Sequence, residues 1–204
     1  MNKLTAALIS IILCTTVNAE GFNYDYAQVG IGTANSNGYD KEYYVEASKS
    51  INNNIAIAGG LAYSYGDWVT PFAYLEKRVS SYYLESLYHK DITPNTNLLA
   101  SVEYAHSDYK YNCTEISGEY CYVIHPSSTY YIANLGARHK VTNDIEVEGQ
   151  YKYSKTKGVN FKMTQAKLAL VKTVTKKISV GVEHTRGLSN TGFKRYGVFV
   201  RRSF

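Results

Sequence analysis

Long apolar stretches are what this sequence most clearly lacks once its first residues are passed. After residue 19, no run is long enough for a helix that spans a bilayer, so a membrane location would have to be achieved by strands. Proline and tryptophan are scarce, with 3 copies and 1 copy, whereas Tyr occurs 21 times and Gly 15 times. Tyrosine suits a membrane–water interface, because its ring stays in hydrocarbon while its hydroxyl reaches water. The composition favours strands and turns, and the length favours one domain.

The sequence also has no strong excess or cluster of one charge. Its 22 Lys and Arg residues against 17 Asp and Glu give a formal net charge of +5, and the two signs are interspersed. A nucleic-acid-binding protein usually gathers its cations on one face, so we expect no nucleic-acid partner. The five histidines are scattered without a metal-binding spacing, and the glycines form no phosphate-binding loop. We therefore expect no metal and no cofactor.

The first 19 residues predict a secretory signal peptide. Lys3 is the only charge among them, residues 4–17 are mostly apolar, and the VNA tripeptide that ends at Ala19 offers small residues for cleavage after it. The apolar segment is short and interrupted by Thr and Ser, unlike a transmembrane helix. The predicted organisation is therefore a signal peptide at 1–19 and one exported domain at 20–204.

Four segments repeat one pattern, in which a β-branched residue enters a short polar turn and an alternating strand leaves it. They lie at 48–60, 89–104, 138–153 and 171–184. Short polar turns on one side are typical of the periplasmic rim of a membrane barrel. Four such turns, with a first and a last strand whose free ends lie on that side, predict ten strands. The predicted ranges are 22–33, 39–50, 55–66, 80–90, 98–110, 129–139, 145–156, 161–172, 178–187 and 195–204.

Residues 67–79 are the ambiguous part of this assignment. They fit either a loop or an extension of the strand predicted at 80–90. A separate hairpin there would move the C-terminus to the opposite side of the barrel, so we exclude it. An eight-stranded barrel, with one hairpin misassigned, is the structural alternative.

The alternation along the strands separates two faces, because successive side chains of a strand point to opposite sides. We expect the apolar set to face lipid and the charged set to face the interior. A narrow barrel is filled by side chains, and buried charges persist only when they are paired and hydrogen-bonded. We therefore predict an internal salt-bridge network, with a proton or ion path as the alternative role. Its members are Glu46, Glu85, Glu103, Glu146, Glu148, Glu183, Arg138, Lys152, Lys167, Arg195 and Arg201.

The last strand alternates and then ends on an aromatic residue. Its apolar parity, predicted to face lipid, consists of Tyr196, Val198, Val200 and Phe204. The signal peptide, the turn repeats and the terminal FVRRSF together resemble the small outer-membrane β-barrel proteins of Gram-negative bacteria, of the opacity-type and porin-like kinds. Arg202 departs from that pattern, since an apolar residue is more usual there, but near a rim it could snorkel to headgroups.

The resemblance implies an all-β, antiparallel up-and-down transmembrane barrel in the cell outer membrane, reached by export through the periplasm. It further implies insertion by the outer-membrane assembly machinery, which reads the terminal strand. Contact with outer-membrane lipids and lipopolysaccharide follows from that location. The cations expected near the outer ends for such contact are Lys110, Lys157, Lys194 and Arg195.

Two cysteines lie in the longest gap between predicted strands. Cys113 and Cys121 are separated by seven residues, and no other cysteine follows the signal peptide. In an oxidising envelope such a pair predicts one disulfide, here in an extracellular loop. A zinc site would need further ligands that the segment lacks.

For function, we expect a non-enzymatic surface protein that acts structurally or through its extracellular loops on a host or cell-surface ligand. A narrow channel for small solutes or ions is the alternative. A lipid or peptide hydrolase is a third reading: His125-Pro126-Ser127 is similar to the His-x-Ser spacing of outer-membrane lipid deacylases, and His106-Ser107 is another adjacent pair. The sequence has no Asp-x-Asp, which the outer-membrane aspartyl-type proteases would require, so we expect no catalytic residues.

Overall fold

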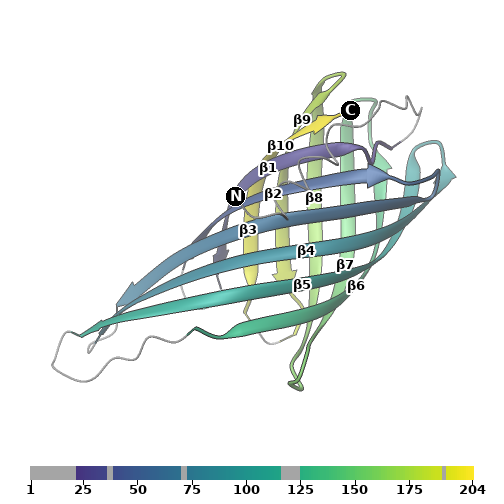
Figure 1. Ribbon diagram of the computed structural model, residues 1–204. Helices are drawn as coiled ribbons and strands as arrows, with labels where there is room; N and C mark the ends of the chain where they lie inside the picture. The colour runs from purple at the N-terminus through teal and green to yellow at the C-terminus, as the bar shows by residue number, and fades with distance from the viewer. Residues whose placement is uncertain (1–21, 36–38, 70–72, 116–124, 190–191) are drawn as a thin grey trace.

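The computed structural model describes residues 22–35, 39–69, 73–115, 125–189 and 192–204. They form ten strands in one closed antiparallel barrel, in which sequence neighbours pair and β1 pairs with β10 (Figure 1). No helix in these ranges is long and apolar enough to cross a membrane. The strands are β1 Tyr26–Asn35, β2 Tyr39–Ser50, β3 Ile55–Val69, β4 Ala73–Thr93, β5 Thr96–Glu115, β6 Ser127–Lys140, β7 Ile145–Thr156, β8 Lys162–Thr175, β9 Ile178–Gly187 and β10 Lys194–Ser203.

The ten-strand prediction is confirmed, and the eight-strand alternative is wrong. Three predicted ranges, 39–50, 145–156 and 178–187, coincide with β2, β7 and β9. The described part of the ambiguous range 67–79 forms no separate hairpin. Residues 67–69 extend β3 and residues 73–79 extend β4, whereas the sequence had suggested a loop or an extension of the later strand only.

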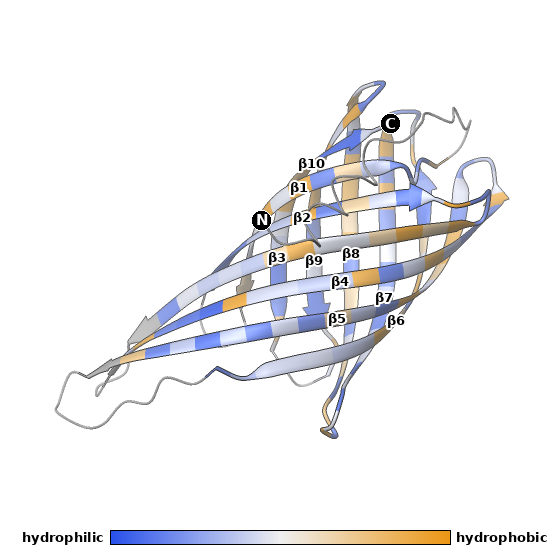
Figure 2. Ribbon diagram, in the orientation of Figure 1, coloured by the Kyte–Doolittle hydropathy of each residue, from blue (hydrophilic) through white to orange (hydrophobic). Residues whose placement is uncertain are grey.

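The strands form because apolar and polar side chains alternate along them, so that one set points outward and the other points into the barrel. On β10, Tyr196 and Val198 point outward and are 54% and 49% exposed, whereas Phe199 between neighbouring outward positions is buried. Figure 2 shows the same alternation of hydrophobic and hydrophilic residues along other strands. The outer surface is therefore apolar, and the polar parity fills the interior.

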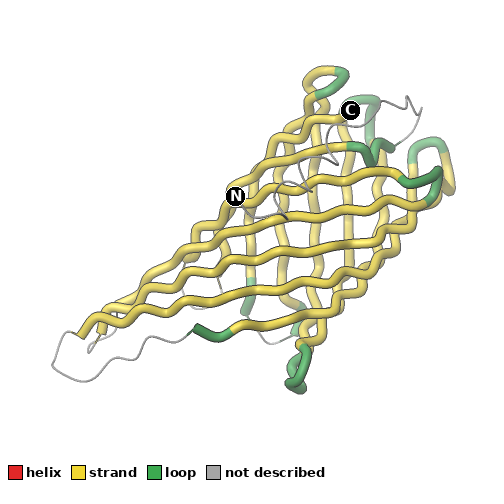
Figure 3. Tube along the Cα trace, in the orientation of Figure 1, coloured by secondary structure: helices red, strands yellow, loops and turns green. Residues whose placement is uncertain are grey.

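Short turns gather at one end of the barrel, which we call the turn rim (Figure 3). A carbonyl oxygen in each turn accepts a hydrogen bond from a backbone N–H of the strand that follows the hairpin. His89 N of β4 donates to Asn54 O in the β2–β3 turn at 2.8 Å, and Ser203 N of β10 donates to Lys177 O in the β8–β9 turn at 2.8 Å. Phe204 N donates to Asp25 O at 3.0 Å on the same rim. The four predicted turns and the last residue thus lie at one end, as an even number of antiparallel strands requires.

The opposite end, which we call the loop rim, is uneven. The strands β3, β4 and β5 contain 15, 21 and 20 residues, against 10 in β1 and 12 in β2. The pairing of β3 with β2 stops at Tyr65, and that of β5 with β6 stops at Asp108, whereas β4 and β5 pair out to Glu115. The three strands therefore project beyond the barrel as a ribbon, visible at the lower left of Figure 1.

The residues before β1 close the lumen at the turn rim. Phe22 and Tyr24 are buried in a cluster with Ala56 and Leu99. Tyr24 donates a hydrogen bond to Asn97 Oδ1 at 2.8 Å, and its ring stacks on His89 with centroids 3.8 Å apart. The predicted strand at 22–33 was therefore wrong at its start, because these residues turn into the barrel mouth instead of pairing.

Two aromatic rings cross the middle of the interior over glycines. A Cβ placed on Gly181 would lie 2.2 Å from the Phe199 ring, and one on Gly30 would lie 2.3 Å from the Tyr44 ring. Tyr44 and Phe199 form a second buried cluster with Val171. The absence of side chains at these two glycines is what makes room for the rings.

Candidate functional site in the barrel lumen

The lumen holds a cavity of about 270 Å³ lined mostly by charged and other polar side chains. That volume suits water or a small solute, whereas wide aqueous channels belong to much larger barrels. All members of the predicted network except Glu146 line it, and Glu42 lines it as well. The lumen is therefore the place where the sequence-predicted residues meet.

At the centre of the network, one acid joins two cations from different strands. Glu183 of β9 lies 3.3 Å from Lys167 Nζ and 3.2 Å from Arg195 Nη2. Arg195 also contacts Glu42 of β2 at 2.6 Å, which links the two sides of the β1–β10 junction. Ion pairs thus cross the strand pair at which the barrel closes.

Toward the turn rim, a second acid continues the chain of ion pairs. Glu148 of β7 lies 3.5 Å from Lys167 Nζ and 3.8 Å from Arg138 Nε. Arg138 donates a hydrogen bond to Glu146 at 2.7 Å, and its guanidinium lies 4.8 Å from the centre of the Tyr24 ring. Only 4% of Arg138 is exposed. A charge at that depth costs several kcal/mol unless it is paired, so these contacts are needed to keep it there.

Three of the predicted network residues are satisfied by neutral partners instead of opposite charges. Glu46 accepts a hydrogen bond from the Tyr26 hydroxyl at 2.5 Å. Arg201 donates to Gln28 Oε1 at 3.0 Å. Glu85, the third, accepts hydrogen bonds from two neutral side chains.

Glu85 accepts hydrogen bonds from the Ser101 hydroxyl and from Asn134 Nδ2, the latter at 3.2 Å. Its neighbour Glu103 lies 3.9 Å from Lys152 Nζ, at the outer limit of an ion pair. Glu46 of β2, Glu85 of β4 and Glu103 of β5 are thus less fully neutralised than Glu148 of β7 and Glu183 of β9. The cavity has a more acidic side and a more basic side.

Sequence reasoning missed several charged residues of the interior. Glu42 has the same parity as Glu46 on one strand, so the alternation alone could have found it. Two further ion pairs, Lys49 with Asp25 at 2.5 Å and Lys77 with Asp40 at 2.6 Å, lie toward the two rims. Their partners come from strands or segments that no local pattern connects.

Other predicted residues lie outside the lumen. Lys110 and Lys194 are exposed on β5 and β10, and Lys157 is exposed in the turn after β7. Arg195 instead faces the interior, where it pairs with Glu42 and Glu183, so it is not available for contact with lipid headgroups.

The cysteine pair and the cleavage site are only partly described. Cys113 lies on β5 toward the loop rim, whereas Cys121 and Ala19 lie outside the described residues. The disulfide and cleavage after Ala19 therefore stay predictions.

The adjacent residues His106 and Ser107 point to opposite sides of β5. The His106 ring contacts Thr129 Oγ1 at 3.0 Å and Asp108 Oδ1 at 3.2 Å on the outer face. Ser107 shares a hydrogen bond with Ser81 at 2.8 Å on the inner face. Strand alternation separates the two side chains, so they cannot act on one substrate. His125 is exposed in the segment before β6.

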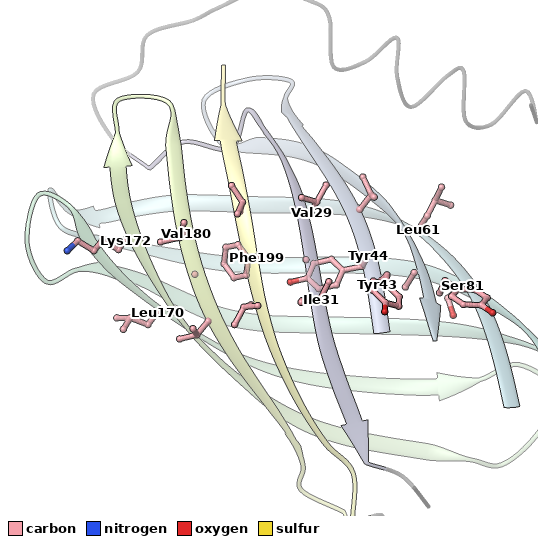
Figure 4. Close-up of a pocket in the computed structure, with 18 of the residues that line it drawn as sticks. Val29, Ile31, Tyr43, Tyr44, Leu61, Ser81, Leu170, Lys172, Val180 and Phe199 are labelled. Atoms are coloured by element: carbon pink, nitrogen blue, oxygen red, sulfur yellow. The ribbon is translucent and has the colours of Figure 1, made fainter. Parts of the chain in front are cut away.

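The outward parity forms a broad apolar surface. An open depression of about 1100 Å³ on it runs across β8, β9, β10, β1, β2 and β3 and reaches β4. Figure 4 shows its labelled side chains, with Leu170, Val180, Val29 and Leu61 among them and Lys172 at one side. Such an exposed apolar expanse on a barrel with a charged interior is the reverse of a water-soluble protein.

Comparison with known proteins shows the fold. No protein-family model and no curated protein sequence matches the chain. The solved transport unit of the autotransporter AIDA-I from Escherichia coli is 9% identical, with a TM-score of 0.55, over 98% of this chain and 97% of that one. The translocator domain of the autotransporter NalP from Neisseria meningitidis is 10% identical, with a TM-score of 0.52, over 98% and 95%. Neisserial surface protein A is 12% identical, with a TM-score of 0.45, over 88% and 95%.

Proposed function

We propose that this chain, whose closed ten-stranded barrel has the fold of outer-membrane β-barrel proteins, is a non-enzymatic surface protein of the outer membrane. Its role is structural or consists of binding partners at the loop rim. The observation that carries the proposal is the inverted distribution of side chains, apolar outside and charged inside. A signal peptide cleaved after Ala19, export through the periplasm and insertion by the outer-membrane assembly machinery belong to the same proposal.

The outward tyrosines support the membrane location. Tyr63, Tyr82, Tyr104, Tyr131 and Tyr153 lie on the consecutive strands β3 to β7 and are between 37% and 50% exposed. Aromatic girdles of this kind mark the membrane–water interface in membrane barrels. Val102 and Leu135 lie on the turn-rim side of this girdle and are 65% and 64% exposed, which suits contact with acyl chains.

The ribbon of β3, β4 and β5 is the part best placed to meet a host or cell-surface ligand. It projects past the other strands and carries charged side chains, among them Glu76 and Arg78, which pair at 3.1 Å. We place the Cys113–Cys121 disulfide next to this ribbon, since Cys113 lies near its end on β5. A crosslink there would limit fraying of the exposed loop.

A narrow channel is the second candidate function. The polar cavity of about 270 Å³ favours it, as do Glu46 and Glu85, which lack a cationic partner among the described residues. Against it stand Phe22 and Tyr24, which fill the mouth at the turn rim. We therefore place the closed surface protein first.

Planar-bilayer recording separates the two candidates. The refolded protein should show no stable conductance steps, because ion pairs and aromatic rings fill its lumen. The matched variants are Glu103→Gln and Lys152→Gln, which each remove one member of a weak ion pair facing the cavity. Stable openings of the wild type that change in size or selectivity in these variants would establish the channel instead. Unboiled and boiled samples should migrate differently on a gel, which checks that the recorded protein is a folded barrel.

A further inference from the structure

A cluster of lysines lies on the outward face of the β7–β8 hairpin. Lys155 of β7 and Lys162 of β8 are directly opposite each other in the ladder, and Lys157 follows in the turn. All three side chains are exposed. Like charges directly opposite each other on paired strands destabilise a sheet. The two ammonium groups of Lys155 and Lys162 repel each other, and a bound anion would reduce this repulsion.

No acid neutralises this cluster in the part of the chain that the structure describes. None of the three ammonium groups forms an ion pair or a side-chain hydrogen bond there. Arg78, an outward cation on β4, is by contrast paired with Glu76 at 3.1 Å. The positive charge of the hairpin is therefore available to a ligand.

Two of the lysines, Lys155 and Lys157, line a hollow of about 440 Å³, and Lys162 lies opposite Lys155 on the next strand. It is lined by Tyr131, Lys155, Thr156, Lys157, the turn residues up to Asn160, and no acidic side chain. Gly158 has a φ of 79°, which glycine adopts without strain, and it lets the turn curl over the hollow. Tyr131 lies beside Lys155 on the neighbouring strand and is 50% exposed. The site thus offers a phenol and two ammonium groups around one space.

The cluster lies just beyond the tyrosine girdle. The rings of Tyr104 and Tyr131 meet edge to face with centroids 5.9 Å apart, and Tyr153 continues the row on β7. Lys155 is two residues past Tyr153, which is about 7 Å along a strand. Because girdle tyrosines lie at the headgroup level, this step places the lysine ammonium groups at the depth of lipid phosphates.

We propose that Lys155, Lys157, Lys162 and Tyr131 form a binding site for the phosphate groups of lipopolysaccharide in the outer leaflet. The proposal rests on the outer-membrane location proposed above and gives it one specific lipid contact. Two ammonium groups at the hollow, with Lys162 directly opposite Lys155 on the next strand, match a headgroup with more than one phosphate charge better than the single phosphodiester of a glycerophospholipid. The tyrosine hydroxyl supplies a neutral donor beside them, while its ring stays against the acyl region.

The test compares binding of fluorescent lipopolysaccharide to the purified, refolded full barrel in a zwitterionic detergent. Lys155→Gln and Lys162→Gln should each weaken binding about fivefold, and the double variant should lose more than either, because one basic residue near an anionic headgroup contributes about that factor. The matched control is Lys172→Gln with Lys177→Gln. It removes two exposed lysines from β8 and the turn at the opposite rim, and its affinity should stay that of the wild type.

Each outcome decides the proposal. Unchanged binding in the double variant, or an equal loss in the control, would overturn it, because the attraction would then be absent or spread over the whole surface. Equal competition by phosphatidylglycerol or by inorganic phosphate would overturn lipopolysaccharide as the source. The heat-dependent gel shift identifies variants that have failed to fold. Since binding is measured on purified protein, fractionation of cells tests the membrane location separately.

Discussion

Single residues decide how tightly the lumen is filled, and the clearest case is Gly181 beneath the Phe199 ring. A methyl group at Gly181 would lie 2.2 Å from that ring, so the ring must move. We predict that Gly181→Ala lowers the free energy of unfolding by about 1–3 kcal/mol, the usual range for overpacking a core. Urea titration of the refolded barrel in detergent, followed by its gel shift, measures the change.

Gly149 provides the matched control on a neighbouring part of the sheet. A Cβ at this position meets no heavy atom within 4 Å, because it points outward. Gly149→Ala should leave the unfolding midpoint unchanged or raise it slightly, since alanine restricts the unfolded chain. Equal loss in both variants would mean that strand geometry, and not the ring above Gly181, sets the requirement for glycine.

Arg138 is the residue on which the ion pairs near the turn rim depend. Its guanidinium contacts Glu146 and Glu148 at 2.7 Å and 3.8 Å. We predict that Arg138→Gln costs about 3–5 kcal/mol of stability, because it leaves buried carboxylates without their cation. Arg202→Gln is the control, since Arg202 is exposed on the adjacent parity of β10 and should change stability little. The same urea titration compares them, and equal midpoints would contradict a structural role for Arg138.

At the scale of elements, the segment before β1 is held at the turn rim by Asp25. Lys49 Nζ lies 2.5 Å from Asp25 Oδ2, and Ser50 N donates to Asp25 Oδ1 at 2.7 Å. Burial alone would raise the pKa of Asp25, but these two donors outweigh it and hold the pKa below its usual value. The carboxylate is therefore more stable in the folded state than in the unfolded chain.

A lowered folded-state pKa gives a definite direction to the pH dependence. The contribution of Asp25 is complete above its unfolded pKa of about 4 and is lost as the pH falls through the lower folded value. We predict that Asp25→Asn is less stable than the wild type at pH 7 and that the difference shrinks toward pH 3. Melting temperatures across that range test this. A difference that grew on acidification would show that the pKa is raised instead.

Sequence patterns predicted those elements whose two faces meet different surroundings. The bounds of β2, β7 and β9 follow from alternation that ends at polar turns. The ends of β3 and β4 between 67 and 79 carry no such signal, because beyond the barrel wall both faces of a ribbon meet polar surroundings. Phe22 and Tyr24 alternate as a strand does, and only closure of the barrel around them decides that they enter the mouth.

The candidate site was likewise predictable only in part. Alternation along the strands predicts that the network residues lie on the inner face, and it would have predicted the same of Glu42. It could not distinguish Glu183, which meets two cations, from Glu85, which has only neutral donors. Those partners come from strands distant in sequence, and their meeting depends on the register around the whole barrel.

At the scale of the whole molecule, the two rims differ in regularity. The turn rim is a ring of short turns joined by hydrogen bonds from one strand to the next. The loop rim rises over β3 to β5 and falls at β1 and β2. A barrel built in this way has one even end and one end with a directional projection, so partners at the loop rim would meet different surfaces from different sides.

The contact between Phe204 N and Asp25 O at 3.0 Å has a consequence for chain connectivity. The segment before β1 and the C-terminal residue are therefore neighbours at the turn rim. A flexible linker from Phe204 to Phe22, with new termini opened at the β4–β5 turn, would keep every strand pair. We predict that this permuted chain refolds in detergent to the same heat-shifted form but is not inserted in cells. Its terminal residues Tyr196, Val198, Val200 and Phe204 would no longer end the chain.

Insertion of the permuted chain at the wild-type level, measured by fractionation of cells, would contradict a terminal sorting signal. Failure to refold in detergent would instead show that the break at β1 and β10 is needed for folding. We therefore predict that the strand register of β10 and the proposed signal for the outer-membrane assembly machinery can be separated. The register should survive the permutation, whereas the signal should be lost.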